Sequence, residues 1–256
     1  EKADALIVGE VVNYPDKWLR AIDAVMNFSL RHIVRDVVLG ELAPARAGQM
    51  VDRLVADAGI EPLLKSWMVI DNHDIPRIAT QFPEAAQRRL VQVLQFTLPG
   101  APNVYYGSEV GMTGGEDPEN RGPMRWDWVH ADNPELVWLK RLIDLRRTHR
   151  ALRIGDYRRV EADRLLAFER YTDRALDTIV ILVNPASAAV TDRIMIANAD
   201  LMDDTPMIDV LGPEEAPPVG TVGAAFMTVT VPPKTAFVLK PRERQLGGYS
   251  RYKRLS

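Results

Sequence analysis

Residues whose types suit proton transfer and charge stabilisation gather at the end of one short apolar segment. Trp67 to Ile70 is a run of apolar, partly β-branched residues, and Asp71, Asn72, His73 and Asp74 follow it directly. A buried parallel strand delivers side chains in this way to a site at its carboxyl end. Carboxylate and imidazole groups placed there can transfer protons or stabilise developing charge. The simpler interpretation is a strand followed by a turn rich in Asn and Asp.

Two further segments end in the same way, which favours the functional interpretation. Ala5 to Val8 is continuously apolar and leads to Gly9 and Glu10. Asn103 to Gly107 leads to Ser108 and Glu109. A single Glu after a strand is commonly a solvated surface residue. Three polar strand ends of this kind, however, would meet at one edge of a parallel sheet.

The order of the predicted elements indicates parallel βα units. We predict strands at about 4–11, 23–28, 67–71 and 103–107, each followed by a helix. The predicted helical segments cover about 30–58, 82–98 and 133–149. Apolar spacings of three and four, with Pro at the start and Gly at the end, support them. Alternating strands and helices are typical of a parallel sheet with right-handed crossovers.

After Gly155 the sequence changes to short segments rich in Val, Thr and Ile, separated by turn residues. This pattern predicts antiparallel strands, which we place at 165–170, 178–184, 226–231 and 235–239. We therefore divide the chain into an α/β domain over 1–152 and an antiparallel β domain over 153–244. We expect the polar and basic tail over 245–256 to be flexible.

The composition is that of a globular protein and argues against several classes. The 32 basic and 35 acidic residues give a net charge of −3, so there is no electrostatic case for a nucleic-acid or anionic-membrane partner. No apolar stretch approaches the roughly 18 residues of a membrane span. There is no cysteine, no dinucleotide or Walker loop, and no metal-ligand spacing among the four His. A cytoplasmic location is favoured.

Four motifs in a fixed order connect these observations to a known family. They are Gly9-Glu10-Val11, Asp71 to Asp74, Pro102 to Met112, and Asp117 to Asp127. Together they resemble the α-amylase family of glycoside hydrolases, family 13. The last motif and the segment 23–27 are most similar to cyclomaltodextrinases, neopullulanases and maltogenic amylases. The resemblance extends from Asp4 to about Lys240.

The resemblance implies a particular α/β fold. The segment 1–152 would form strands five to eight, the C-terminal half, of a (β/α)8 barrel. The segment 153–244 would form the antiparallel β-sandwich domain that follows the barrel in this family.

The resemblance also implies two catalytic residues. Glu10 falls on the family's general acid/base, and Asp74 falls on the carboxylate that stabilises the transition state. Retaining glycosidic cleavage requires an acid that protonates the leaving oxygen and a carboxylate nucleophile roughly 5 Å away. The acid needs a raised pKa, for which we expect a buried position of Glu10 behind Ala5 to Val8.

Four substrate-binding residues follow from the same resemblance. Asn72 and His73 occupy the positions that flank the stabilising carboxylate, where the His binds the sugar next to the scissile bond. Asp117 and Arg121 match a pair that holds the sugar one position further away.

The family's nucleophile has no match in the chain. It is an Asp in a Gly-x-Arg-x-Asp pattern at the end of strand four, whereas the nearest pair, Arg35-Asp36, lacks the Gly and follows strand six. We therefore expect the chain to be the C-terminal half of an enzyme. The N-terminal half of the barrel would come from the same parent chain or from a second polypeptide; a different fold is the remaining alternative. Calcium, common in the family, would bind through the absent half, so no metal or other cofactor is assigned.

The expected function is that of a retaining α-glucan hydrolase acting on α-1,4 bonds, with α-1,6 cleavage and transglycosylation as further activities. The expected substrate is an α-glucan oligosaccharide or a cyclodextrin. The chain by itself is expected to be inactive. The alternatives are an inert fragment or a non-enzymatic binding or assembly protein with the amylase fold, and an isomerase or sucrose-acting relative.

Overall fold

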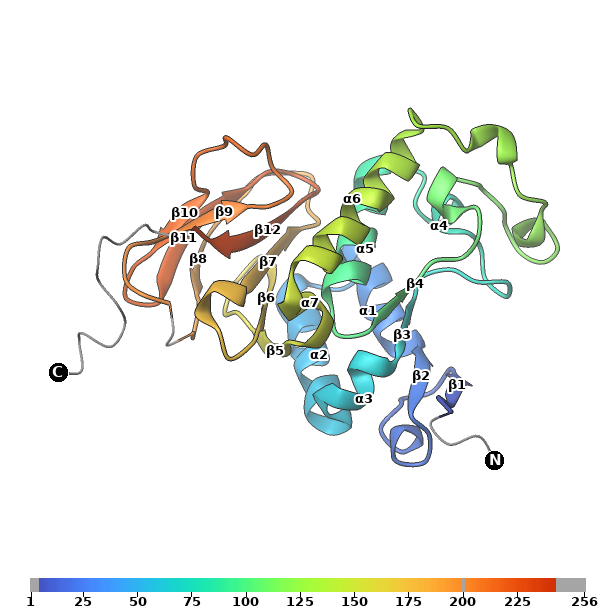
Figure 1. The fold of residues 1–256 in the computed structure, drawn as a ribbon, viewed down its shortest axis with the longest axis horizontal. Coiled ribbons are helices and arrows are strands. Elements are labelled where there is room, and N and C mark those ends of the chain that lie inside the picture. The colour runs from blue at the N-terminus through green and yellow to red at the C-terminus, as the bar shows by residue number, and fades with distance from the viewer. Residues whose placement is uncertain (1–4, 199–200, 243–256) are drawn as a thin grey trace.

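The computed structural model describes residues 5–198 and 201–242, in which two parts lie side by side (Figure 1). The first part contains the parallel strands and most of the helices, and the second contains the antiparallel strands. The tail over 245–256 lies outside the described residues.

A four-stranded sheet in the order β1-β2-β3-β4 forms the first part. Its strands are β1 (Val8–Val11), β2 (Ala24–Asn27), β3 (Trp67–Val69) and β4 (Ala101–Asn103). All three pairings are parallel, so the carboxyl ends of the strands share one edge of the sheet. The helices are α1 (Phe28–Leu39), α2 (Pro44–Ala58), α3 (Ile60–Lys65), α4 (Ile78–Gln81), α5 (Ala85–Thr97), α6 (Pro134–Thr148) and α7 (Arg150–Ile154).

Local sequence signals fix the helix ends. The Asn27 side chain accepts a hydrogen bond from the Leu30 N–H at 3.0 Å and so caps α1 directly after β2. Asn133 caps α6 in the same way, with Pro134 at the first helical position. The continuous helix predicted over 30–58 is wrong, because Gly40 adopts a left-handed φ of 77° and ends α1 before α2 begins.

All four strands of the first part are shorter than predicted, and the differences are most informative at β1 and β4. β1 begins only at Val8. The Ile7 carbonyl still accepts the Ala24 N–H at 3.1 Å, but the Ile7 N–H donates to the Asp23 side chain at 2.9 Å. The strand predicted over 103–107 is misplaced: β4 covers Ala101–Asn103 and shares only Asn103 with it. Beyond Asn103 the chain turns, and the Ser108 N–H donates to the Tyr105 carbonyl at 3.1 Å. The helix predicted after the first strand is also wrong, since the three-residue 3-10 helix η1 (Trp18–Arg20) connects β1 to β2.

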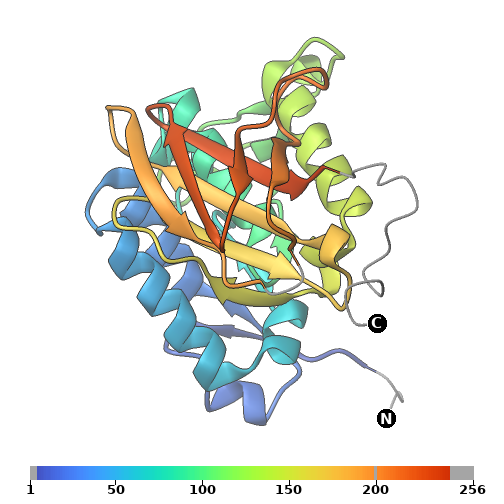
Figure 2. The same cartoon turned by 90° about the vertical axis from the view of Figure 1, so that its left-hand side faces the viewer.

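The second part contains two antiparallel sheets. One has the order β10-β9-β12-β7-β6-β5, and the other pairs β11 with β8. The strands are β5 (Asp156–Arg159), β6 (Leu166–Tyr171), β7 (Ile179–Asn184), β8 (Val190–Met195), β9 (Thr205–Asp209), β10 (Gly220–Val222), β11 (Phe226–Val231) and β12 (Thr235–Pro241). The larger sheet lies between the helices and β8 and β11 (Figure 2).

The side chains of β7 explain this layering. Ile179, Ile181 and Val183 belong to a core shared with the helices, whereas Val180 and Leu182 belong to a second core shared with β8 and β11. Both faces of β7 are therefore buried, which accounts for its unbroken apolar sequence. β8 and β11 alternate between buried and exposed residues, as expected for strands with one solvated face.

Two arginines bind the carboxyl end of α5, where the two parts meet. Arg170 of β6 is fully buried and donates to the carbonyls of Thr97 at 2.8 Å and Gly155 at 2.7 Å. Arg146 of α6 donates to the Phe96 carbonyl at 3.0 Å. Burial lowers the pKa of Arg170 to about 9 and that of Arg146 to about 10. The last carbonyls of a helix lack partners within it, so these cations satisfy them.

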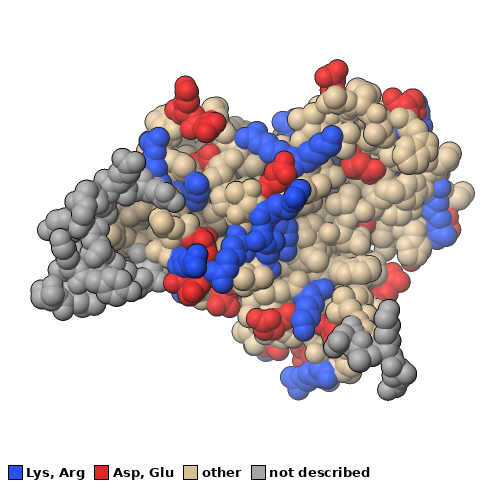
Figure 3. Space-filling view, in the orientation of Figure 1, with Lys and Arg blue, Asp and Glu red and all other residues tan. Residues whose placement is uncertain are grey.

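The surface near this junction carries further basic residues. Figure 3 shows Lys and Arg side chains in a band across the middle of one face, with Asp and Glu among them. Arg147 and Arg153 lie in the last turns of α6 and α7, where positive charge complements the helix dipole.

We predict that Arg170→Met lowers the free energy of unfolding by about 2–4 kcal/mol, because buried carbonyls then lose a charged donor. Urea unfolding at neutral pH measures the change. Arg174→Met is the control, since Arg174 is exposed on the same side of the junction. A loss no larger than that of the control would show that the Arg170 contacts add nothing to stability.

Candidate active site

A tight turn at the carboxyl end of β3 presents two of the predicted residues. Asn72 is buried and forms a β-bridge with Ile75, and its side-chain oxygen accepts the Asp74 N–H at 2.9 Å. His73 and Asp74 therefore lie at the tip of the turn, with 54% and 50% of their side chains exposed. The His73 Nε2 atom is 3.4 Å from the Asp74 carboxylate.

The 3-10 helix η3 (Glu119–Arg121) brings the other predicted pair to this turn. The Arg121 guanidinium lies 3.2 Å from the Asp74 carboxylate and 3.3 Å from the Asp117 carboxylate. It also donates to the His73 carbonyl at 3.0 Å. The structure thus joins His73, Asp74, Asp117 and Arg121 in one exposed cluster, although about 40 residues separate the two segments in sequence.

Glu10 lies apart from this cluster. It is the next-to-last residue of β1 and pairs with Met26 of β2, so β2 stands between it and β3. Its side chain is exposed, and Leu6 and Ile7 are each 56% exposed. The expectation of a buried Glu10 is therefore wrong for the described residues. The physical reason is that β1 is an edge strand in this part of the chain.

Asp71 supports the turn from within the protein, a role that its type and position in the sequence do not indicate. Its buried carboxylate accepts the Ser108 hydroxyl at 2.5 Å and the Ile78 N–H at 2.8 Å. Burial raises the pKa of Asp71, while these two donors and the nearby charge of Arg77 act in the opposite direction. Asp71 and Asp74 are the same residue type, so the sequence does not distinguish them. Their positions in the turn do, because Asp71 is buried and Asp74 is half exposed.

Arg77 is a second residue that the sequence analysis missed. Its side chain is fully buried, and its guanidinium lies 4.6 Å from the ring centroids of both Tyr105 and Tyr106. It donates to the Tyr106 carbonyl, and its own N–H donates to the Gly114 carbonyl at 2.9 Å. The Tyr106 hydroxyl in turn donates to the Gly122 carbonyl at 2.7 Å. Arg77 therefore connects the turn after β3 to the loop after β4.

The long loop over 111–133 is ordered by short elements. η2 (Ser108–Val110) precedes it, and η3 and η4 (Trp126–Trp128) lie within it.

Across residues 5–198 and 201–242, no group of three or more His, Cys, Asp or Glu side chains is arranged to hold a metal ion. No helix in these same ranges is long and apolar enough to cross a membrane.

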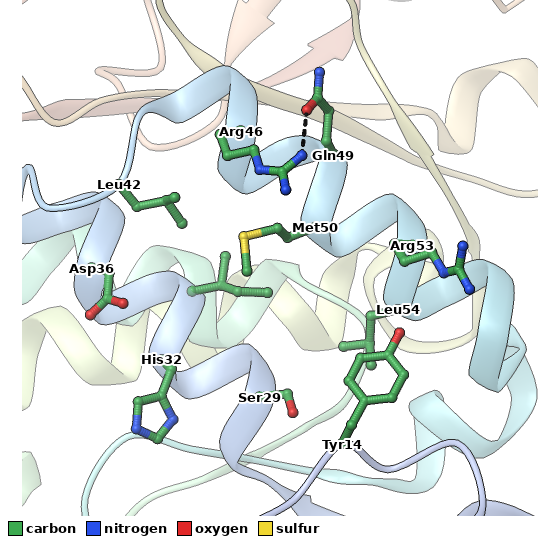
Figure 4. A pocket seen from close by; sticks show the side chains of 11 residues that line it. Tyr14, Ser29, His32, Asp36, Leu42, Arg46, Gln49, Met50, Arg53 and Leu54 are labelled. Atoms are coloured by element: carbon green, nitrogen blue, oxygen red, sulfur yellow. Dashed lines mark hydrogen bonds between the residues drawn. The ribbon is translucent and has the colours of Figure 1, made fainter.

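A separate hollow lies between α1 and α2 (Figure 4). Its volume is about 480 Å³, and Tyr14, Ile33, Met50 and Leu54 supply apolar lining. The Tyr14 hydroxyl donates to the Asp57 carboxylate at 2.9 Å, which fixes the ring at the rim. None of the six predicted site residues lines this hollow.

Comparison with known proteins defines the class of this chain. Residues 1–141 match the family described as "Alpha amylase, catalytic domain". The chain therefore belongs to the α-amylase family, as its motifs predicted.

Individual proteins similar to this chain include two curated relatives and one solved structure. A cyclomaltodextrinase of Bacillus sp is 34% identical over 197 residues, which are 74% of this chain and 35% of that protein. Neopullulanase 2 of Thermoactinomyces vulgaris is 34% identical over 177 residues, 65% of this chain and 30% of that protein. The native debranching enzyme of Nostoc punctiforme superposes with a TM-score of 0.80 at 26% identity, covering 93% of this chain and 52% of that structure. The chain spans about a third of the length of these two curated relatives.

We predict that Ser108→Ala lowers the free energy of unfolding by about 1–3 kcal/mol at neutral pH, because it leaves the buried Asp71 carboxylate with one donor fewer. A raised pKa in the folded state means that the ionised form costs stability, and that this cost is relieved as the pH falls through the folded pKa. The effect of the substitution should therefore shrink toward acid pH.

Urea unfolding between about pH 8 and about pH 4.5 measures this dependence. Ser187→Ala in the exposed β7–β8 connection is the control. A deficit that is independent of pH would contradict the coupling between Ser108 and Asp71.

Proposed function

We propose that this chain supplies the acid/base side of the active site of a retaining α-glucan hydrolase. The observation that carries the proposal is the exposed cluster of His73, Asp74, Asp117 and Arg121 at the carboxyl edge of a parallel sheet. Membership of the α-amylase family supports it, as do the names of the related cyclomaltodextrinase and neopullulanase. The proposed substrates are α-glucan oligosaccharides or cyclodextrins, cleaved at α-1,4 and also α-1,6 bonds, with some transglycosylation.

The proposed chemistry divides between two carboxylates. Glu10 donates a proton to the leaving oxygen and then, as a carboxylate, takes a proton from the attacking water. Asp74 lies against the ring hydroxyls and stabilises the positive charge of the oxocarbenium-like transition state. Arg121 orients the Asp74 carboxylate through the 3.2 Å contact between them.

The remaining residues of the cluster would bind sugar. His73, half exposed beside Asp74, can donate to a hydroxyl of the sugar next to the scissile bond. Asp117 and Arg121 present a carboxylate and a guanidinium to the sugar one position further away. Asn72, which the resemblance places among the sugar-binding residues, is only 4% exposed. We propose that it shapes the turn instead, because its side-chain oxygen accepts the Asp74 N–H.

We further propose that the chain provides strands five to eight of a (β/α)8 barrel and that the nucleophile comes from the other half. The parallel order of β1 to β4 supports this assignment. The apolar residues Leu6, Ile7 and Val12 are exposed beside β1, and a partly apolar hollow lies between α1 and α2. Such surfaces suit packing against the first half of the barrel, from the same parent chain or from a second polypeptide.

The competing function is that of an inert binding or assembly protein that retains the fold. The exposed position of Glu10 favours this alternative for the chain by itself. Activity of the completed barrel separates the two functions.

We predict that the complete polypeptide containing this chain hydrolyses a chromogenic α-maltoside, and that Glu10→Gln lowers kcat at least about 100-fold by removing the proton donor. The chain by itself should be inactive. The control is Glu215→Gln, an exposed Glu on the β part. Full activity after Glu10→Gln would exclude Glu10 as the acid/base, and no activity in the unaltered complete polypeptide would favour the binding protein.

A further inference from the structure

Asn120 is a buried residue directly before Arg121, and it has no role in the function proposed above. Its side chain is 0% exposed. Its amide nitrogen donates to two backbone carbonyls, that of His73 at 2.8 Å and that of Ile75 at 3.2 Å. These carbonyls belong to the residues immediately before and after Asp74. One amide group thus holds the backbone on both sides of the proposed stabilising carboxylate.

The neighbouring residue completes the arrangement. Arg121 shares the His73 carbonyl with Asn120 and contacts the Asp74 carboxylate itself. The segment 120–121 therefore contacts the turn after β3 in two ways: Asn120 binds the backbone of the turn, and Arg121 binds its acidic side chain. The Asn120 side-chain oxygen is buried without a hydrogen-bond partner, so the side chain is oriented by its two donated bonds.

We propose that Asn120 is a positioning residue for catalysis, which rests on the proposed function of Asp74. It touches no substrate, because it is fully buried beneath the turn. It sets the height and direction of Asp74 relative to Arg121, and hence the distance from the carboxylate to the developing charge. Displacements of about 1 Å at such a group cost up to about 100-fold in rate. Its loss should lower kcat with little change in the binding of the ground state.

The first test uses the complete polypeptide. Asn120→Ala should lower kcat about 10- to 100-fold while KM changes less than about threefold. Asn120→Leu fills the same space without a donor and should not restore the rate. The matched control is Asn184→Ala: Asn184 is also 0% exposed, and its amide donates to the carbonyls of Val231 at 3.0 Å and Pro232 at 2.9 Å, in the β part. Its loss should cost stability with kcat unchanged for folded protein.

The second test also uses the complete polypeptide but does not depend on activity. Amide hydrogen exchange of Asp74, whose N–H donates to Asn72, should speed up at least about tenfold in Asn120→Ala relative to Asn184→Ala at equal global stability. If the alanine variant does not fold, Asn120→Ser and Asn184→Ser replace the pair in both tests.

The outcomes separate the two proposals. A complete polypeptide that is inactive without any substitution overturns the proposed function, and with it the catalytic role of Asn120, whatever the exchange rates. An active enzyme in which Asn120→Ala or Asn120→Leu keeps kcat at the level of Asn184→Ala overturns the positioning role. Unchanged exchange at Asp74 overturns it as well, because the turn would then be held without Asn120.

Discussion

The parallel pairing of β1 to β4 is the constraint on which the site depends. Parallel strands end at one edge of the sheet, so every loop that follows a strand starts from the same side. The turn over 72–75 and the loop that carries Asp117 and Arg121 are distant in sequence, yet both leave the sheet at this edge. Their contacts follow from the adjacency of β3 and β4, and no local propensity of either segment would bring them together.

Two sets of polar contacts then fix the conformation of the turn over 72–75. Beneath the turn, Asp71 accepts hydrogen bonds from Ser108 and from the first residue of α4. Across it, Asn120 binds the carbonyls on both sides of Asp74. Burying a polar group without a hydrogen-bond partner costs free energy. Because the hydrogen bonds of Asp71 and Asn120 can form only in this conformation of the turn, they favour it over other conformations. The exposed side chains at the tip can therefore be held still without being buried themselves.

The sequence predicted the parts of this structure that local pattern controls. The apolar run before Asp71 and the Asn and Pro residues at the start of α6 correctly indicated a strand and a helix. The resemblance of four motifs predicted the family, which the comparisons confirm. The sequence did not predict residues whose burial depends on contacts between distant segments. Arg77 and Asn120 lie in polar stretches without periodicity, and no local feature indicates that they are buried. The prediction that Glu10 is buried was wrong for a related reason. An apolar run before Glu10 does not show how many neighbouring strands its own strand has.

The exposure of Glu10 and the open side of β1 have one physical origin. Among the described residues β1 pairs with β2 alone, which leaves one row of its backbone groups and the flanking Ile7 uncovered. On the proposed function, a general acid needs surroundings that favour its protonated form. A parallel strand added beside β1 would satisfy the backbone groups, cover Ile7 and enclose Glu10 in the same step. On the proposed function, covering the open side of β1 and burying Glu10 are therefore one packing event.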